Sequence, residues 1–139
     1  MATTITFDHD LDYLDTSFGW APALLVTLGN PQKPGESIDA LGFLDTGAQR
    51  TLFDGELTQA LGIDIFSGRK QDFSSTLGGS MSAHQHEVVL SHPALGRLSF
   101  PVCFSLGPIH RNLFGRDFLE LLQVGFRQYD QMFFLSPRR

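Results

Sequence analysis

The chain has 139 residues, of which 42% are hydrophobic, and its 15 acidic against 10 basic residues give a formal net charge of −5. This length suits one domain with a sizeable core, and the hydrophobic content excludes a disordered chain. The acidic balance, without any basic cluster, argues against nucleic acid or an anionic membrane as a partner.

Cysteine usage and the N-terminal residues indicate the compartment. The single cysteine, Cys103, can form no internal disulfide. The chain begins without the basic start and long apolar core of a signal peptide, and no stretch has the length of a membrane span. We therefore expect a cytoplasmic protein in which Cys103 fills space and carries no chemistry.

Residues 1–19 are acidic, with an aspartate at nearly every second position from residue 8 to residue 12. Three of these could begin a calcium loop, but Tyr13 stands where such a loop needs glycine and Gly19 where it needs glutamate. We interpret this segment as an N-terminal arm or edge strand whose charges oppose edge-to-edge pairing. The domain proper is then expected at residues 20–139.

Residues 20–28 and 37–44 are apolar runs separated by a turn rich in proline and glycine, which predicts a hairpin. The second run ends at Asp45, so a carboxylate lies at a strand end, where it can face a cleft. Thr46 adds a hydroxyl that can lock the turn, and Gly47 permits backbone angles barred to residues with a Cβ atom. Taken alone, this stretch also fits an ordinary turn between two strands.

Residues 73–90 alternate around the glycine pair at 78–79, which supplies the positive φ of a tight hairpin turn. His84 and His86 fall on one face of the returning strand, and His92 is the one nearby candidate for a third metal ligand. A solvated strand face explains the pair more simply, so we expect no metal and no other cofactor.

The segment 112–122 reads Asn-Leu-Phe-Gly-Arg-Asp-Phe-Leu-Glu-Leu-Leu. It predicts a short buried strand at 113–115 that runs beside the Asp45 turn, followed by a helix at 116–123. A shorter helical turn is compatible with residues 53–61. A last strand is expected at 126–135.

Three stretches together resemble the retroviral-type aspartic proteases, the retropepsins. They are Leu-Asp-Thr-Gly-Ala at 44–48, the glycine pair at 78–79 and Leu-Phe-Gly-Arg-Asp at 113–117. That family has a hydrophobic strand leading into Asp-Thr-Gly-Ala, a glycine-tipped flap, and later two hydrophobic residues before Gly-Arg-Asn or Gly-Arg-Asp. The resemblance spans about residues 20–135 and implies an all-β, retropepsin-like barrel with a flap hairpin and one short C-terminal helix.

The resemblance also implies an aspartic endopeptidase, a hydrolase that cleaves polypeptides with a water activated by two aspartates. Two carboxylates about 3 Å apart cannot both ionise, so one accepts a proton from water while the other donates to the carbonyl oxygen. The chain holds one complete Asp-Thr-Gly, and Asp15-Thr16-Ser17 lies too close before Asp45 to hold a second lobe. The second carboxylate is therefore expected from a second copy, in a homodimer that also buries the apolar segment 132–135.

By resemblance, the residues of the site fall into three groups. They serve catalysis (Asp45, Thr46 and Gly47), contact with the substrate (Ala48, Gln49, Arg50, Leu77, Gly78 and Gly79) and structural support of the loop (Gly115, Arg116 and Asp117).

One departure from the family pattern leaves a question open. Retroviral enzymes usually carry acidic residues where this chain has Gln49 and Arg50, and the first of them pairs with the arginine of Gly-Arg. Arg116 therefore lacks its expected partner, for which Asp54, Asp117 and the partner subunit are the candidates. Arg50, expected at the rim of the cleft, gives two alternatives: a preference for acidic or polar side chains near the scissile bond, or a solvent-facing arginine without effect on specificity.

The alternative to an enzyme is a catalytically silent module that keeps the fold for dimerisation or peptide binding. Intact Asp-Thr-Gly-Ala at 45–48 and the glycine pair favour the enzyme, because a binding module could lose Asp45 freely.

Overall fold

The computed structural model describes residues 1–74 and 78–138 and consists mainly of β-strands, with 53% strand and 10% helix. This confirms the predicted all-β class. Within the described residues, no helix is long and apolar enough to cross a membrane.

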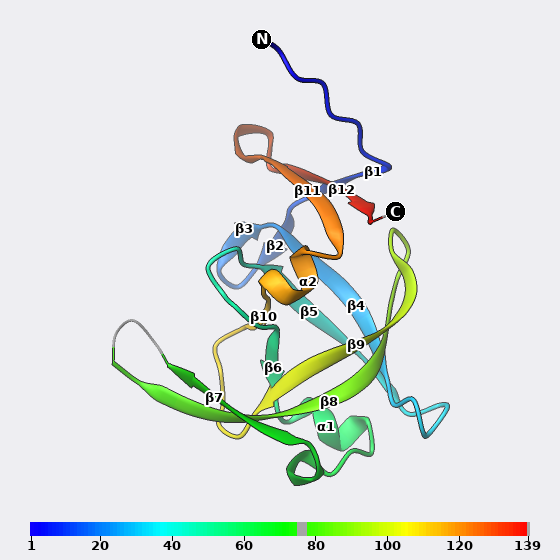
Figure 1. The fold of residues 1–139 in the computed structure, drawn as a ribbon, viewed down its shortest axis with the longest axis vertical. Helices are drawn as coiled ribbons and strands as arrows, with labels where there is room; N and C mark the ends of the chain where they lie inside the picture. The colour runs from blue at the N-terminus through cyan, green and yellow to red at the C-terminus, as the bar shows by residue number, and fades with distance from the viewer. Residues whose placement is uncertain (75–77, 139) are drawn as a thin grey trace.

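The largest sheet forms the body of the molecule, with the strand order β4-β5-β10-β6-β9-β8-β7 (Figure 1). An additional pairing of β4 with β8 curls this sheet toward a closed barrel. The strands are β4 (Ala23–Gly29), β5 (Ser37–Leu44), β6 (Leu52–Asp54), β7 (Arg69–Ser74), β8 (Ser80–His92), β9 (Gly96–Ser105) and β10 (Asn112–Phe114).

The β4–β5 hairpin has the predicted position and positions the acidic turn. It is antiparallel, with Ala23 opposite Phe43 and Leu25 opposite Leu41. Because side chains alternate along a strand, Gly42 and Leu44 face the core while Leu41 and Phe43 lie on the other face. Asp45, the next residue in that alternation, follows the strand end.

Aromatic rings fill the core beneath the Asp45 turn. Phe114 stacks on Phe118 with ring centroids 4.2 Å apart and meets Phe53 edge-on at 5.2 Å. Gly42 lets β5 pass directly over these rings, since a Cβ atom there would clash with Phe114. The core thus holds the ends of β5 and β10 together.

The predicted hairpin at 73–90 is present, formed by β7 and the long strand β8, which pair from Arg69↔Gln85 to Ser74↔Ser80. It reaches out from the barrel (Figure 1). Between β6 and β7 lie the helical turns α1 (Leu57–Ala60) and η1 (Ile65–Ser67). The first agrees with the helical turn expected within residues 53–61.

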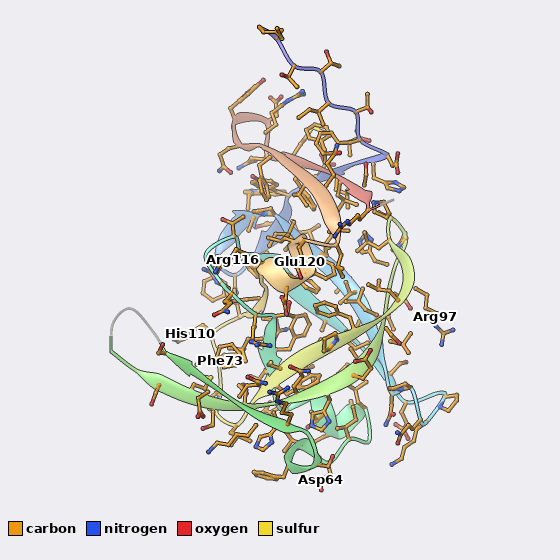
Figure 2. All side chains as sticks on the ribbon, viewed as in Figure 1. Asp64, Phe73, Arg97, His110, Arg116 and Glu120 are labelled. Carbon is orange, nitrogen blue, oxygen red and sulfur yellow. The ribbon has the colours of Figure 1, made fainter. Side chains whose placement is uncertain are left out.

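Beyond Gly115 the structure differs from the expected helix and single strand. Helix α2 (Arg116–Leu119) is one turn long, with Arg116 at its start and Glu120 just past its end (Figure 2). A hairpin follows, built of β11 (Leu122–Arg127), η2 (Gln128–Asp130) and β12 (Met132–Pro137). The left-handed backbone of Gln131, with φ 54°, reverses the chain inside the stretch expected as one strand.

The two ends of the chain meet in a separate sheet of order β1-β12-β11, where β1 spans His9–Asp12. Strand β12 is therefore the central strand, paired with β1 on one side and β11 on the other. Its side chains Phe133 and Leu135 are fully buried within one chain, whereas Met132 and Phe134 are half-buried. Burial of segment 132–135 by a second copy therefore stays a prediction for the latter two. As expected, β1 is an edge strand with exposed aspartates.

A small hairpin of β2 (Leu14–Thr16) and β3 (Gly19–Ala21) connects the terminal sheet to the barrel. Its turn presents Phe18, half exposed at 52%, whose ring meets Phe43 of β5 edge-on at 5.9 Å. Tyr13, just before the hairpin, is buried and donates from its hydroxyl to Gln128 Oε1 at 2.7 Å.

Candidate active site

Backbone contacts fix the Asp45 loop, residues 45–50, at the end of β5. The Asp45 amide donates to the Phe114 carbonyl at 2.9 Å, as expected for a strand at 113–115 running beside this turn. The Gly47 amide donates to Asp45 Oδ1 at 2.8 Å, so the turn itself orients the carboxylate. A Cβ atom at Gly47 would lie 3.2 Å from Oδ1 and crowd it. Asp45 is half-buried.

The segment after β10 crosses directly over this loop. Arg116 donates its amide to the Ala48 carbonyl at 2.8 Å, and Asp117 to the Gln49 carbonyl at 3.3 Å. Gly115 makes the crossing possible, because a Cβ atom there would lie 2.8 Å from the Arg50 nitrogen. In the sequence Gly-Arg-Asp, the glycine lets the two segments approach closely, and the amides of the next two residues hold the loop by hydrogen bonds.

The Asp117 carboxylate ties the loop to α2. It accepts hydrogen bonds from the Thr51 amide at 2.9 Å, the Thr51 hydroxyl at 2.8 Å and the Phe118 amide at 2.8 Å. The Thr51 hydroxyl in turn accepts from the Gly115 amide at 3.1 Å, and Thr51 is fully buried. Asp117 is therefore occupied by Thr51 and Phe118 and does not pair with Arg116.

Arg116 finds its partner on the backbone. Its Nη1 donates to the Thr46 carbonyl at 3.0 Å, and the rest of the exposed side chain borders the cleft described below. Among the described residues the one ion pair is Arg127 with Asp130, so neither Asp54 nor Asp117 replaces the missing acidic partner. A peptide carbonyl of the acidic turn itself takes that place.

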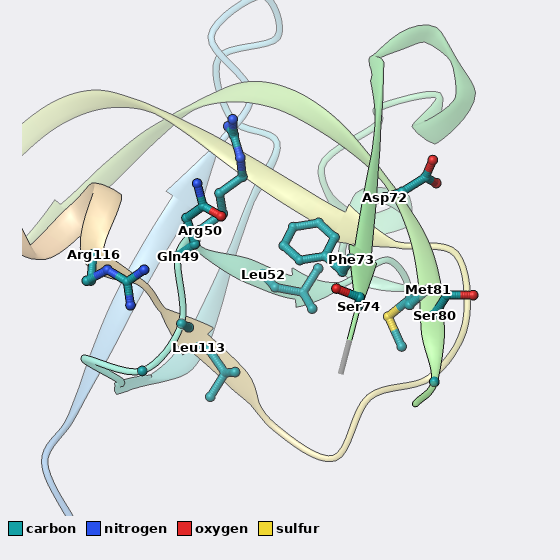
Figure 3. Close-up of a pocket in the computed structure, with 13 residues that line it drawn as sticks. Gln49, Arg50, Leu52, Asp72, Phe73, Ser74, Ser80, Met81, Leu113 and Arg116 are labelled. Atoms are coloured by element: carbon teal, nitrogen blue, oxygen red, sulfur yellow. The ribbon is translucent and has the colours of Figure 1, made fainter. Parts of the chain in front are cut away.

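A cleft of about 670 Å³ lies between the Asp45 loop and the β7–β8 hairpin (Figure 3). Leu52 and Phe73 point toward one another across it, and Leu113 and Met81 add apolar surface, whereas Asp72 points away. Such a mixture of apolar walls and backbone edges suits an extended peptide, whose side chains need pockets and whose main chain needs hydrogen bonds.

The sequence-predicted residues divide between this cleft and its surroundings. Six of them line it, and Asp45 and Thr46 immediately precede the first of these residues. Gly78 is exposed with φ 93°, as the tip of a tight turn requires, and Leu77 lies outside the described residues. The six that line the cleft are Gly47, Ala48, Gln49, Arg50, Gly79 and Arg116.

Sequence reasoning did not name the rest of the lining as site residues, although four of them fall in the hairpin predicted at 73–90. Alternation after Arg50 could have identified Leu52, and the hydrophobic position before Phe114 could have identified Leu113. The hairpin residues depend on which face of β7 and β8 turns inward, which no local pattern reveals. The missed residues are Leu52, Asp72, Phe73, Ser74, Ser80, Met81 and Leu113.

The two histidines of β8 do not lie on a solvated face, and that expectation is wrong. His84 is buried, with Nδ1 3.0 Å from the Gly68 carbonyl, and His86 Nε2 lies 2.7 Å from the Ile65 carbonyl. Both rings therefore connect β8 to the η1 region at the base of the hairpin. Within residues 1–74 and 78–138 there is no cluster of three or more side chains suited to a metal ion.

Cys103 lies in β9 opposite Leu52 of β6 and is buried. Burial, together with the charge of Asp117, raises the pKa of its thiol to about 11 against the opposing effect of Arg50. The neutral thiol is a poor nucleophile, as expected of a space-filling cysteine.

Comparison with known proteins supports the fold. No family model and no curated protein matches the chain. Among solved structures, EIAV protease in complex with an inhibitor aligns with a TM-score of 0.54 at 17% identity, over 77% of this chain and 92% of that one. A retropepsin-like aspartic protease from Rickettsia conorii aligns with a TM-score of 0.59 at 16% identity, over 96% of both chains. The chain therefore has the retropepsin-like fold, as the sequence resemblance implied.

Proposed function

We propose that this protein is an aspartic endopeptidase that hydrolyses peptide bonds with Asp45. The observation that carries the proposal is the half-buried carboxylate of Asp45, held by the Gly47 amide beside a cleft of about 670 Å³. The fold shared with retropepsin-like proteases supports the same conclusion.

The chemistry requires a second carboxylate. One carboxylate accepts a proton from water while the other, protonated, donates to the carbonyl oxygen of the peptide. The chain has one complete Asp-Thr-Gly, at 45–47, and we propose that a second copy supplies the other across a two-fold axis. The catalytic unit is then a homodimer.

The other residues of the cleft bind and orient the substrate in this proposal. The apolar side chains of Leu52, Phe73, Met81 and Leu113 contact the side chains of an extended peptide. The β7–β8 hairpin acts as a flap that covers the peptide and excludes water. Its glycine at position 79 presents backbone without a side chain.

A cytoplasmic location fits this proposal. Cys103 is the sole cysteine and is buried, so the fold depends on no disulfide and suits a reducing compartment.

Cleavage of a peptide library by the wild type and by Asp45→Asn, from acid to neutral pH, tests the proposal. Removing the carboxylate should lower kcat/KM by about 10²–10⁴-fold, the usual contribution of a general acid or base. Asp15→Asn is the matched control, since Asp15 begins the incomplete Asp-Thr-Ser sequence. Peptide binding with equal, negligible cleavage by the wild type and Asp45→Asn would instead establish a silent binding module.

A further inference from the structure

The outer face of β5 carries a second pocket, separate from the cleft. It has a volume of about 230 Å³ and is lined by Phe18, Leu41, Phe43 and Arg111, together with polar residues of the neighbouring loops. Phe43 precedes Asp45 by two residues, and side chains two apart on a strand share a face. The pocket, here called the Arg111 pocket, therefore lies on the face of β5 that points away from the core, and its residue Phe43 is two positions before Asp45 in the chain.

Two aromatic rings hold Arg111 in place. Its guanidinium carbon lies 5.4 Å from the ring centroid of Phe18 and 5.0 Å from that of Phe43. The side chain is exposed, and it has no hydrogen bond or ion pair within the part of the chain that the structure describes. A guanidinium that stacks on aromatic rings keeps its N–H donors in its own plane, where a carboxylate can bind them in pairs.

The chemistry of the lining favours an anion. None of the described residues that line the pocket is acidic. Two of them, His110 with its imidazole and Arg111 with its guanidinium, can donate hydrogen bonds from nitrogen to an anion. Asn112 is occupied, because its Nδ2 donates to the Leu41 carbonyl at 3.0 Å. At about 230 Å³ the pocket is smaller than a typical ligand pocket of about 300–1,000 Å³, so it accommodates one side chain and not a whole molecule.

The position of the pocket sets which substrate residue reaches it. Two residues of β-strand span about 7 Å, so Phe43 lies about that far along the chain from Asp45. A bound peptide in extended conformation has the same spacing. For a peptide that runs along this face of β5, a side chain about two residues from the scissile bond lies over Arg111.

We infer that the Arg111 pocket is a subsite for an acidic side chain of the substrate, with the Arg111 guanidinium as the specificity-determining group. This inference rests on the proposed peptidase function and names its substrate class as peptides with aspartate or glutamate near the cleaved bond. It differs from the expectation based on Arg50, which lines the cleft and, among the described residues, lies over no aromatic ring.

Matched peptides test the inference. Pairs that differ only by glutamate or glutamine are placed at each of the two positions on either side of the cleaved bond. The wild type should prefer glutamate at one position by about fivefold to tenfold in kcat/KM, as for a charge-assisted pair at a partly exposed site. Arg111→Gln should remove the preference, so that the glutamate and glutamine peptides of each pair are cleaved with about equal kcat/KM.

Arg127→Gln is the matched control, because Arg127 also lies over an aromatic ring, at 5.1 Å from the Phe134 centroid, but lines neither the cleft nor the Arg111 pocket. It should keep the glutamate preference. Arg111→Lys keeps the charge without the planar fork and should retain only part of the preference. The wild-type preference should also shrink as salt rises.

Binding separates this inference from the peptidase proposal. Fluorescent glutamate and glutamine peptides are titrated into Asp45→Asn, with and without Arg111→Gln, and sedimentation reports the oligomeric state. Tighter binding of the glutamate peptide that depends on Arg111 supports the subsite even if the wild type cleaves nothing. Equal binding of both peptides, an equal loss of both with Arg111→Gln, or dissociation of the dimer by that variant would overturn it.

Discussion

At the scale of single residues, the Asp45 loop depends on a buried network that contains no catalytic group. Asp117 is a positioning residue, because its carboxylate holds the amide and the hydroxyl of the fully buried Thr51. Through Thr51 and Gly115 it fixes the segment that crosses the loop. A substitution of Asp117 should therefore change the position of the Asp45 loop although Asp117 does not contact Asp45 itself.

Asp117→Ala should lower the free energy of unfolding by about 1–3 kcal/mol, because buried donors of Thr51 lose their acceptor. Urea denaturation measures this change. Asp39→Ala is the control, since Asp39 accepts from the exposed Thr27 hydroxyl at 2.6 Å and should change stability by less than about 0.5 kcal/mol. Equal effects of the two substitutions would show that Asp117 has no special role in the loop.

His92 makes the fold sensitive to acid. Burial, and next the charge of His9, lower the pKa of His92 below its ordinary value of 6.5. As pH falls below about 6.5, the unfolded chain takes up a proton at this position before the folded chain does. Stability should therefore be full above pH 6.5 and should decline as pH falls toward the folded-state pKa.

His92→Asn should make the urea midpoint less dependent on pH between 7 and 5, because the titrating group is gone. Asparagine can still accept the Ala94 amide, which now donates to His92 Nδ1 at 3.0 Å. His110→Asn, at an exposed histidine, serves as the control. An unchanged pH slope in His92→Asn would refute the assignment.

Sequence reasoning identified the acidic turn because its signal is local. A strand, a carboxylate and a glycine follow one another at 41–47. It could not identify the partner of Arg116, since the Thr46 carbonyl is a backbone group brought near by the fold. Nor could it identify Arg111, whose aromatic neighbours Phe18 and Phe43 lie far away in the chain.

At the scale of elements, the site is a crossing of two chain segments, the loop after β5 and the start of α2. β5 and β10 run parallel, so their ends emerge side by side, and Gly115 lets the two segments touch. The parallel pairing explains why two motifs about seventy residues apart lie together. Each motif alone is a weak signal, a short apolar strand followed by a glycine, and the two become informative when they occur together in one chain.

Gly115→Ala should force these segments apart, since the new methyl group would lie against the Arg50 backbone. We expect a loss of about 1–3 kcal/mol in the free energy of unfolding, typical of overpacking, and reduced kcat/KM. Gly107→Ala is the matched control, because a Cβ atom there meets nothing within 4 Å. Thermal melts and peptide cleavage compare the two, and similar behaviour would contradict a close crossing.

The stretch after α2 shows where element prediction failed. Leu119, Leu121 and Leu122 fit a continuing helix, yet Leu122 begins β11 opposite Pro137. The reversal at Gln128–Asp130 contains no glycine or proline, so the sequence offered no turn signal. Pairing with β12 and β1, which are distant in sequence, decided the structure there.

At the scale of the whole molecule, the terminal sheet constrains how two copies can associate. β12 pairs with β1 on one side and β11 on the other, within one chain. A second copy therefore cannot pair with β12 without displacing a strand. We propose that the homodimer contact includes the Asp45 loop, where each chain contributes one carboxylate.

The central claim is that two Asp45 side chains from two chains form one active site. The most direct measurement mixes one part of wild type with nine parts of Asp45→Asn at a concentration where the protein is dimeric, after time for exchange. Only about one wild-type chain in ten then has a wild-type partner, so activity per wild-type chain should fall about tenfold. Activity that is unchanged by the excess of Asp45→Asn would show that a single chain catalyses the reaction, and would contradict the account.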